Sequence, residues 1–178
     1  MKTKNLERRL QSFANQVVSD SEAILRGKKG STALGNTIRA EVTKDPNGFS
    51  VKFYMADYGT FVDKGVSGNK NKISYADGNK IKSSPYSYTT KGPPIDILSK
   101  WIKKKGIKPK GLGRGRDKKT GQFLSGFAYL ISRKIKREGI KSLSFFSRPL
   151  GLNYKELQET LLTEFKKDVS TYITTFTK

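Results

Sequence analysis

The sequence contains no cysteine and no histidine. These absences exclude disulfide bonds, thiolate chemistry, zinc sites built from cysteine and histidine, and acid–base catalysis by imidazole. The chain also lacks the run of about 18 apolar residues that a transmembrane helix requires, and its N-terminus lacks the apolar core of a signal peptide. We therefore expect no membrane association, no catalytic site, no metal site and no cofactor.

Acidic residues are scarce, because 15 Asp and Glu stand against 36 Lys and Arg, which gives a net charge of +21. The excess is concentrated between Lys64 and Lys119, where 16 basic residues accompany three acidic ones. Such a charge repels other copies of the chain unless something anionic neutralises it. The cluster indicates a solvated face, a contact with nucleic acid or a contact with an acidic protein, and composition leaves these alternatives open.

The length of 178 residues suffices for one compact domain, which we assign to residues 1–178. Apolar residues make up only 34% of the chain, which favours long exposed or partner-bound segments. Two stretches rich in glycine and lysine, residues 64–92 and 107–122, are predicted to be extended basic loops or insertions, with a small hairpin around residues 76–79.

Hydrophobic periodicity predicts the first elements. A helix is expected over residues 4–26, with one apolar stripe formed by Leu6, Leu10, Phe13, Val17 and Ile24. Alternating apolar and polar residues on both sides of Asp45-Pro46-Asn47-Gly48 predict an antiparallel hairpin over about residues 36–57.

Three further helices are predicted. One follows Pro93-Pro94, carries an apolar face around Trp101 and stops at Gly106, and another spans about residues 125–138. The last covers roughly residues 154–173 and begins with a capping-box pattern of Asn153 and Glu156. The predicted fold class is α+β: a small antiparallel sheet packed by an N-terminal helix, one or two central helices and a C-terminal helix, with long basic loops.

The ends of the two central helices have similar sequences, since residues 102–108 read IKKKGIK and residues 135–141 read IKREGIK. We expect the same ending in both. Gly106 and Gly139 each take the left-handed conformation, and the isoleucine that follows folds back on the last turn.

Motifs with catalytic potential are weak. Residues 27–32 contain glycine and lysine, but their spacing does not match a phosphate-binding loop. Asp57 and Asp63 could approach across a turn and hold a metal ion, as in many nucleases. We favour the simpler interpretation that each ends an element or pairs with a nearby lysine.

Tyrosines interleaved with lysines in the basic segments indicate stacking on unpaired bases or contact with protein, and we favour protein. The candidate DNA or partner contacts are Lys103, Lys104, Lys105, Lys110, Arg114, Arg116, Tyr75, Tyr86 and Tyr88.

Three stretches together resemble the minor tail-component or neck (head–tail joining, tail-completion) family of tailed bacteriophages. They are residues 34–39, which lead into a strand, residues 56–65, with the sequence ADYGTFVDKG, and residues 145–150, with the sequence FFSRPL. Asp63 stands where the family usually has Glu, and Val66 where Thr often follows the glycine. The motif residues are Gly35, Asn36, Tyr58, Val62, Asp63, Gly65, Phe145, Phe146 and Pro149.

The resemblance implies a structural virion protein without catalysis, made in the host cytoplasm and located in the neck or tail. It implies a homo-oligomeric ring around the DNA channel that contacts adjacent portal, connector or tail proteins and makes at most non-specific contact with genomic DNA. Two other classes remain open, namely a sequence-independent nucleic-acid-binding protein and an enzyme that acts on nucleic acid.

Overall fold

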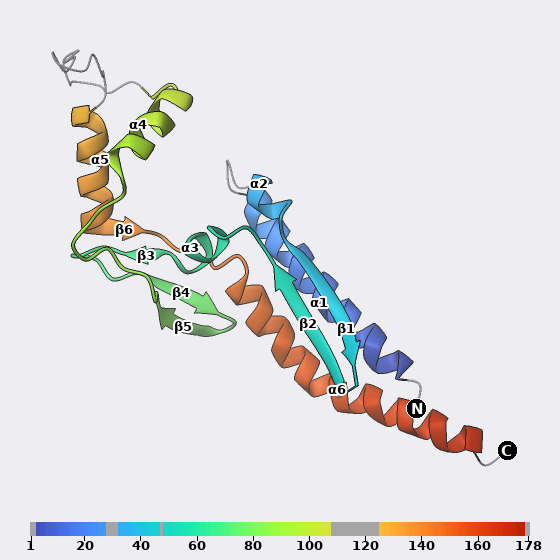
Figure 1. The fold of residues 1–178 in the computed structure, drawn as a ribbon. Helices are drawn as coiled ribbons and strands as arrows, with labels where there is room; N and C mark the ends of the chain where they lie inside the picture. Colours follow the sequence, from blue (N-terminus) through green and yellow to red (C-terminus); the bar gives the residue numbers. More distant parts are fainter. Residues whose placement is uncertain (1–2, 28–31, 47, 108–124, 177–178) are drawn as a thin grey trace. The chain divides into compact units, whose positions relative to one another are not determined.

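The computed structural model describes residues 3–27, 32–46, 48–107 and 125–176 (Figure 1). Helices and two-stranded antiparallel pairs make up the fold, which confirms the predicted α+β class. The chain forms two compact units. Unit 1 combines Met1–Asp63, Tyr75–Lys82 and Leu143–Lys178, and unit 2 combines Lys64–Ser74 and Ser83–Ser142.

This division differs from the single domain predicted over residues 1–178, and the reason lies in the packing. Unit 2 has an apolar cluster of its own, in which Ile102 and Ala128 are buried and Leu98, Ile107 and Ile131 pack around them. The middle of the chain therefore has its own centre of packing, although its composition suggested mainly exposed segments.

Unit 1 is built on two long helices that lie side by side, α1 (Lys4–Arg26) and α6 (Ser147–Phe176) (Figure 1). The bounds of α1 match the prediction. Its buried face contains Leu10, Phe13 and Val17 as expected. Near its C-terminal end the fully buried residue is Leu25, whereas Ile24, which was predicted on the stripe, is partly exposed.

The predicted hairpin is present as β1 (Arg39–Asp45) and β2 (Gly48–Tyr54), in a register that places Val42 opposite Val51. Its apolar face packs with α1 and α6, and Phe53 lies edge-on to Phe13 at 6.1 Å and to Phe146 at 5.4 Å between ring centroids. Two short helices flank the hairpin, α2 (Thr32–Gly35) and α3 (Gly59–Lys64).

The start of the C-terminal helix was predicted wrongly, because α6 begins at Ser147, well before residue 154. Its first turn is capped from a distance. The buried carboxylate of Asp63 accepts hydrogen bonds from the backbone N–H of Phe146 at 2.8 Å, from that of Ser147 at 3.1 Å and from the Ser147 hydroxyl. Pro149 fits this first turn, where no N–H is required.

Asn153 and Glu156, the predicted capping pair, lie inside α6 and have other roles. The Asn153 amide donates to Asp20 Oδ2 at 3.0 Å and to the carbonyl of Pro149 at 2.9 Å, while Glu156 pairs with Arg9 at 3.0 Å. Both therefore tie α6 to α1.

Residues 64–92 contain three strands and do not form one long loop, which corrects the prediction. They are β3 (Val66–Ser67), β4 (Ser74–Asp77) and β5 (Lys80–Ser83). The expected small hairpin is present, with Gly78 at its turn in the left-handed region at φ +60°. The segment is held by backbone bonds on both sides of Ser67, whose N–H donates to Tyr86 and whose carbonyl accepts from Tyr88, each at 2.8 Å.

Unit 2 contains α4 (Ile95–Lys104), α5 (Ser125–Glu138) and β6 (Gly139–Ile140), which pairs with β3. The bounds of both helices agree with the prediction. The predicted basic loop over 107–122 lies, apart from Ile107, outside the described residues.

The two similar helix ends adopt different structures. Gly106 has φ +61°, its N–H donates to Lys103, and the N–H of Ile107 donates to Ile102, so α4 ends in a Schellman motif with Ile107 folded back as predicted. Gly139 also has a positive φ, +80°, but Ile140 continues into β6 and is 40% exposed. The expected fold-back of Ile140 is therefore wrong, because strand pairing replaces it.

We predict that Asp63→Ala lowers the free energy of unfolding by about 2–4 kcal/mol, because it leaves the first turn of α6 without its buried acceptor. Asp63→Asn keeps one acceptor oxygen and should cost less. Chemical denaturation followed by far-ultraviolet circular dichroism measures both. Asp57→Ala, an exposed acid on the preceding connection, is the control, and an equal effect of Asp57→Ala and Asp63→Ala would contradict the capping role.

A second prediction separates the two glycines. Gly106→Ala should cost about 1 kcal/mol, because only backbone strain is added and nothing lies within 4 Å of the new Cβ. Gly139→Ala should cost clearly more, since its Cβ would meet the carbonyl oxygen of Val66 at 2.3 Å. Denaturation followed by the fluorescence of Trp101, the only tryptophan of the chain and a residue of α4, reports on unit 2. Equal losses would show that Gly139 is not tightly enclosed.

Candidate functional site

The three family-like stretches lie in unit 1, apart from Lys64 and Gly65 at the end of the second. Val62 and the fully buried Phe145 pack in one apolar cluster with Leu34 and Ile38, next to the Asp63 cap. Gly35 and Pro149 are buried as well, whereas Asn36 and Tyr58 are exposed. Gly65 belongs to unit 2 and has φ +69°, where a Cβ would meet backbone at 2.7 Å. The buried motif residues thus have a structural role in holding the fold.

Asp63 and Asp57 do not form the metal site that their spacing raised as an alternative. The Asp63 carboxylate is occupied by the N-terminus of α6, and Asp57 is exposed. Within the described ranges, no three carboxylates are grouped so that they could hold a metal ion. In the same part of the chain, no helix is long and apolar enough to cross a membrane.

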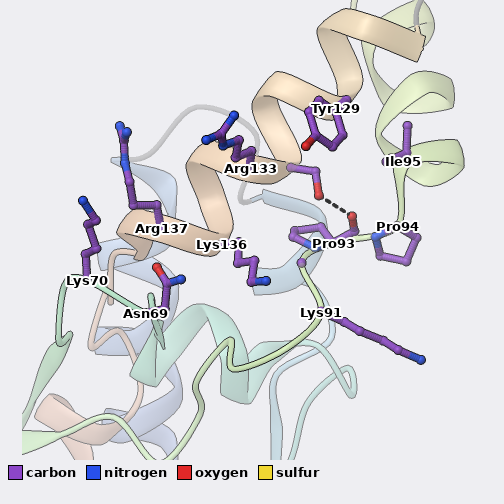
Figure 2. A pocket seen from close by; sticks show the side chains of 12 residues that line it. Asn69, Lys70, Lys91, Pro93, Pro94, Ile95, Tyr129, Arg133, Lys136 and Arg137 are labelled. Carbon is purple, nitrogen blue, oxygen red and sulfur yellow. Dashed lines mark hydrogen bonds between the residues drawn. The ribbon is translucent and has the colours of Figure 1, made fainter.

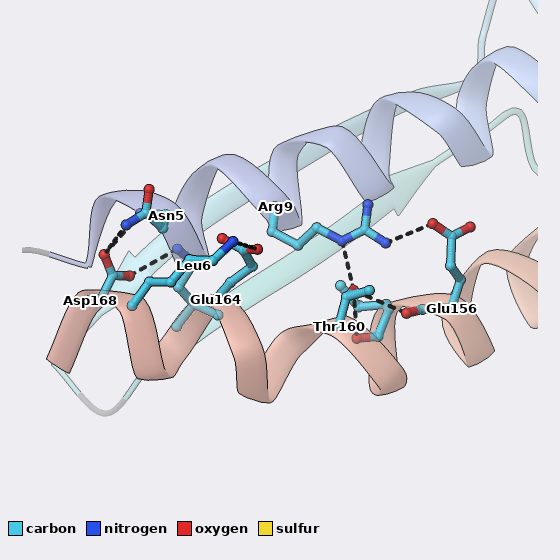
Figure 3. A network of polar contacts seen from close by, with 9 residues as sticks. Asn5, Leu6, Arg9, Glu156, Thr160, Glu164 and Asp168 are labelled. Carbon is cyan, nitrogen blue, oxygen red and sulfur yellow. Dashed lines mark hydrogen bonds and ion pairs between the residues drawn. The ribbon is translucent and has the colours of Figure 1, made fainter. Parts of the chain in front are cut away.

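A second buried acid, Asp168, anchors the other end of the helix pair (Figure 3). Its carboxylate accepts from the backbone N–H of Asn5 at 3.1 Å, from the Asn5 amide at 3.0 Å and from the N–H of Leu6 at 3.0 Å. Burial alone would raise the pKa of Asp168, but the hydrogen bonds from Leu6 and Asn5 outweigh it and hold the pKa below its ordinary value of 3.8. The sequence analysis missed this residue.

Between the two buried acids, Arg9 of α1 links to α6 twice. Its Nε donates to the Thr160 hydroxyl at 2.9 Å, and its guanidinium pairs with Glu156 at 3.0 Å (Figure 3). The helix pair is therefore fastened by polar contacts along its length in addition to its apolar seam.

The candidate contact residues are dispersed. Lys103, Lys104 and Lys105 are exposed at the C-terminal end of α4, while Lys110, Arg114 and Arg116 lie outside the described residues. Tyr75, Tyr86 and Tyr88 are half-buried, and burial raises the pKa of Tyr88 above its ordinary value. These tyrosines do not line the cavity in which other basic residues of unit 2 gather.

That cavity is a groove of about 880 Å³ within unit 2, between α5 and the segment that leads into α4 (Figure 2). One part of its wall is apolar and includes Pro93, Pro94, Ile95 and Tyr129, whose side chain is half exposed. The rest is strongly basic. We call this cavity the basic groove; its charged lining residues are Lys70, Lys91, Arg133, Lys136 and Arg137.

The basic groove has a fixed wall on the Pro93 side. The Ser132 hydroxyl donates to the carbonyl of Pro93 at 2.7 Å, and the Lys136 ammonium donates to the carbonyl of Thr90 at 2.6 Å. Gly92 lies so close to α5 that a Cβ there would meet Ser132 Oγ at 2.9 Å. The segment leading into α4 is therefore held against α5.

No carboxylate lines the described groove. Glu138, which follows the lining residue Arg137 in sequence, pairs with its guanidinium at 2.8 Å. The hydrogen bond from Arg137 lowers the pKa of Glu138 below its ordinary value. Tyr129, Arg133 and Arg137 follow one another at intervals of four along α5 and so share one face of that helix. This spacing was the signal in the sequence that could have revealed the basic groove.

The chain was compared with protein-family models, curated proteins and solved structures, and none of them matches it.

The depressed pKa of Asp168 gives a testable pH dependence. Because its folded pKa lies below 3.8, the stabilisation from this group is fully present above the unfolded pKa and is lost as the pH falls through the folded value. We expect Asp168→Asn to lower stability at neutral pH by about 1–2 kcal/mol. The free energy of unfolding of Asp168→Asn should also fall less steeply than that of the unmodified protein as the pH is lowered from about 5 to about 3.

Denaturation midpoints measured across this pH range test the expectation. The control is Glu159→Gln, which removes an exposed carboxylate from the same helix. A pH profile of Asp168→Asn that runs parallel to that of the unmodified protein would contradict it.

Proposed function

We propose that this protein is a structural subunit of a tailed-bacteriophage virion that forms a homo-oligomeric ring in the head–tail connector, neck or tail, where it joins portal-side and tail-side components around the DNA channel. The observation that carries the proposal is the exposed apolar stripe of α6, a helix whose basic and acidic residues balance. The three family-like stretches, whose buried residues gather around the start of this helix, add support.

The exposed face of α6 is suited to contact with a second copy. Leu162 is 60% exposed and Phe165 43% exposed, and with Val169 they recur at spacings of three and four, so they form one stripe. Exposed apolar stripes of this kind on a soluble protein mark protein contacts.

The charge of α6 also favours self-association. The helix carries four basic and four acidic residues, so it is neutral within a chain of net charge +21. Unit 2, in contrast, has 19 basic and three acidic residues, a net charge of +16. A contact formed by α6 therefore brings no net charge of its own between two copies.

A second candidate, a sequence-independent nucleic-acid-binding protein, is favoured by the same charge of unit 2. Such a protein binds DNA without forming a ring, and its affinity falls steeply with salt because neutralised phosphates release counterions. Assembly and DNA binding measured on one preparation therefore separate the two functions.

We predict that the purified protein assembles into rings visible by negative-stain microscopy, and that native mass spectrometry resolves one closed oligomer. Leu162→Ser combined with Phe165→Ser should leave a folded monomer, because the apolar stripe is removed. Ile81→Ser, which replaces an isoleucine of β5 that is 74% exposed, is the control and should assemble normally.

The virion assignment has its own test. Antibodies against the chain should label the neck or tail of phage particles, and genes for portal, capsid or tail proteins should flank its gene. A monomer that binds duplex DNA at all concentrations, with no label on particles, would favour the second candidate.

A further inference from the structure

We propose that the basic groove of unit 2 is a binding site for an acidic segment of another protein, held in extended conformation with one apolar side chain against Tyr129 and the Pro93–Pro94 wall. This inference concerns a different surface from the α6 stripe and does not depend on ring formation. It stands on three observations: the uncompensated charge, the preformed wall and the mixed polar and apolar lining.

The charge of the groove favours an anionic occupant. Among the described residues, no carboxylate lies within 4 Å of the charged groups of Lys70, Lys91 or Arg133. Lys70 and Arg133 bring like charge to one concave surface, where field lines concentrate and counterions gather, while the Lys91 side chain extends away from them (Figure 2). An anion bound there relieves the repulsion between these like charges as well as forming its own ion pairs.

The wall is built before any ligand arrives. The bonds from Ser132 to Pro93 and from Lys136 to Thr90 fix the segment that faces Arg133, and the close approach of Gly92 to α5 leaves it little room to move. A preformed site loses little entropy on binding, which favours affinity for a flexible partner. Lys136 is engaged in this wall and Arg137 already pairs with Glu138 at 2.8 Å. Lys70, Lys91 and Arg133 are therefore the lining cations without an acidic partner among the described residues, and Arg137 lies one helical turn from Arg133.

The shape and lining favour a polypeptide over nucleic acid. A duplex presents its phosphates on a broad convex surface, whereas the groove is a hollow of about 880 Å³. Single strands are usually held by successive aromatic side chains. Among the described residues, Tyr129 is the one aromatic residue that lines this groove, with two prolines and Ile95 beside it. Guanidinium groups bind carboxylates through paired, parallel hydrogen bonds.

A second copy of the chain is a poor occupant. Unit 2 already carries a net charge of +16, so a neighbouring unit 2 would add to the repulsion. The occupant is therefore a different protein, with several Asp or Glu residues around one large apolar residue. The arginine pair of α5 would bind the carboxylates, while Tyr129, Ile95 and the prolines would contact the apolar residue (Figure 2).

The test uses the full-length protein and a short fluorescein-labelled peptide of Asp and Glu with one central Leu, followed by fluorescence anisotropy at physiological salt. We expect Arg133→Gln combined with Arg137→Gln to weaken binding by about tenfold or more. The matched control, Lys103→Gln combined with Lys104→Gln, removes the same charge from exposed positions of α4 and should change affinity by no more than about twofold. Circular dichroism verifies that all variants are folded.

Two further arms define the ligand. Tyr129→Ala should weaken binding of the Leu peptide but not of a peptide with Ser in place of Leu. Oligothymidine and a short duplex should bind more weakly than the acidic Leu peptide. The proposal is overturned if the control pair loses as much affinity as the arginine pair, if the acidic peptide does not bind, or if oligothymidine binds more tightly through the same arginines.

Discussion

The buried contact between Asp63 and the first turn of α6 is the interaction on which unit 1 depends. It joins two parts of the chain that are 84 residues apart, and it satisfies N–H groups that a helix start otherwise leaves without a partner. Because it fixes where α6 begins, it also fixes Phe145 and Phe146, which face the hairpin and the end of α1. A carboxylate suits this position, since the positive end of the helix dipole favours a negative charge.

The same device recurs at the opposite end of the helix pair, with the roles exchanged. Asp168, near the end of α6, accepts from the first turn of α1, so each long helix has its N-terminus satisfied by a carboxylate from a distant segment. Two of the 15 acidic residues thus accept hydrogen bonds from helix N-termini inside unit 1. The acidic and basic residues of α6 are equal in number. The positive excess remains in unit 2, where it gives the basic groove its character.

The parts of the fold that could be predicted are those that local sequence determines. The periodicity of residues 4–26, the alternation around the Asp45–Gly48 turn, and the Pro and Gly signals around α4 all act over a few residues, and each was confirmed. The start of α6 was not predictable in this way, because the cap comes from Asp63 and the local Asn153 pattern competes with it. Gly139 shows the same limit: its local sequence matches that of Gly106, and only its pairing with β3 decides its ending. The basic groove is made by residues from 69 to 137 that become neighbours only after folding.

The connections of the chain explain why unit 2 is not a simple removable insertion. Its outer ends are held together in unit 1, where the N–H of Leu143 donates to Val62 at 3.0 Å and that of Ser144 donates to Asp63 at 2.9 Å. When the two ends of an inserted segment lie close together in this way, the segment can ordinarily be added or removed without disturbing the rest of the domain. Here, however, the hairpin turn between β4 and β5 belongs to unit 1, and Gly78 lies against Gly151 of α6, so closely that a Cβ on Gly151 would meet the Gly78 nitrogen at 2.5 Å. The sequence of unit 2 is therefore interrupted by residues 75–82, which pack in unit 1, and removal of residues 64–142 as one block would also remove this contact with α6.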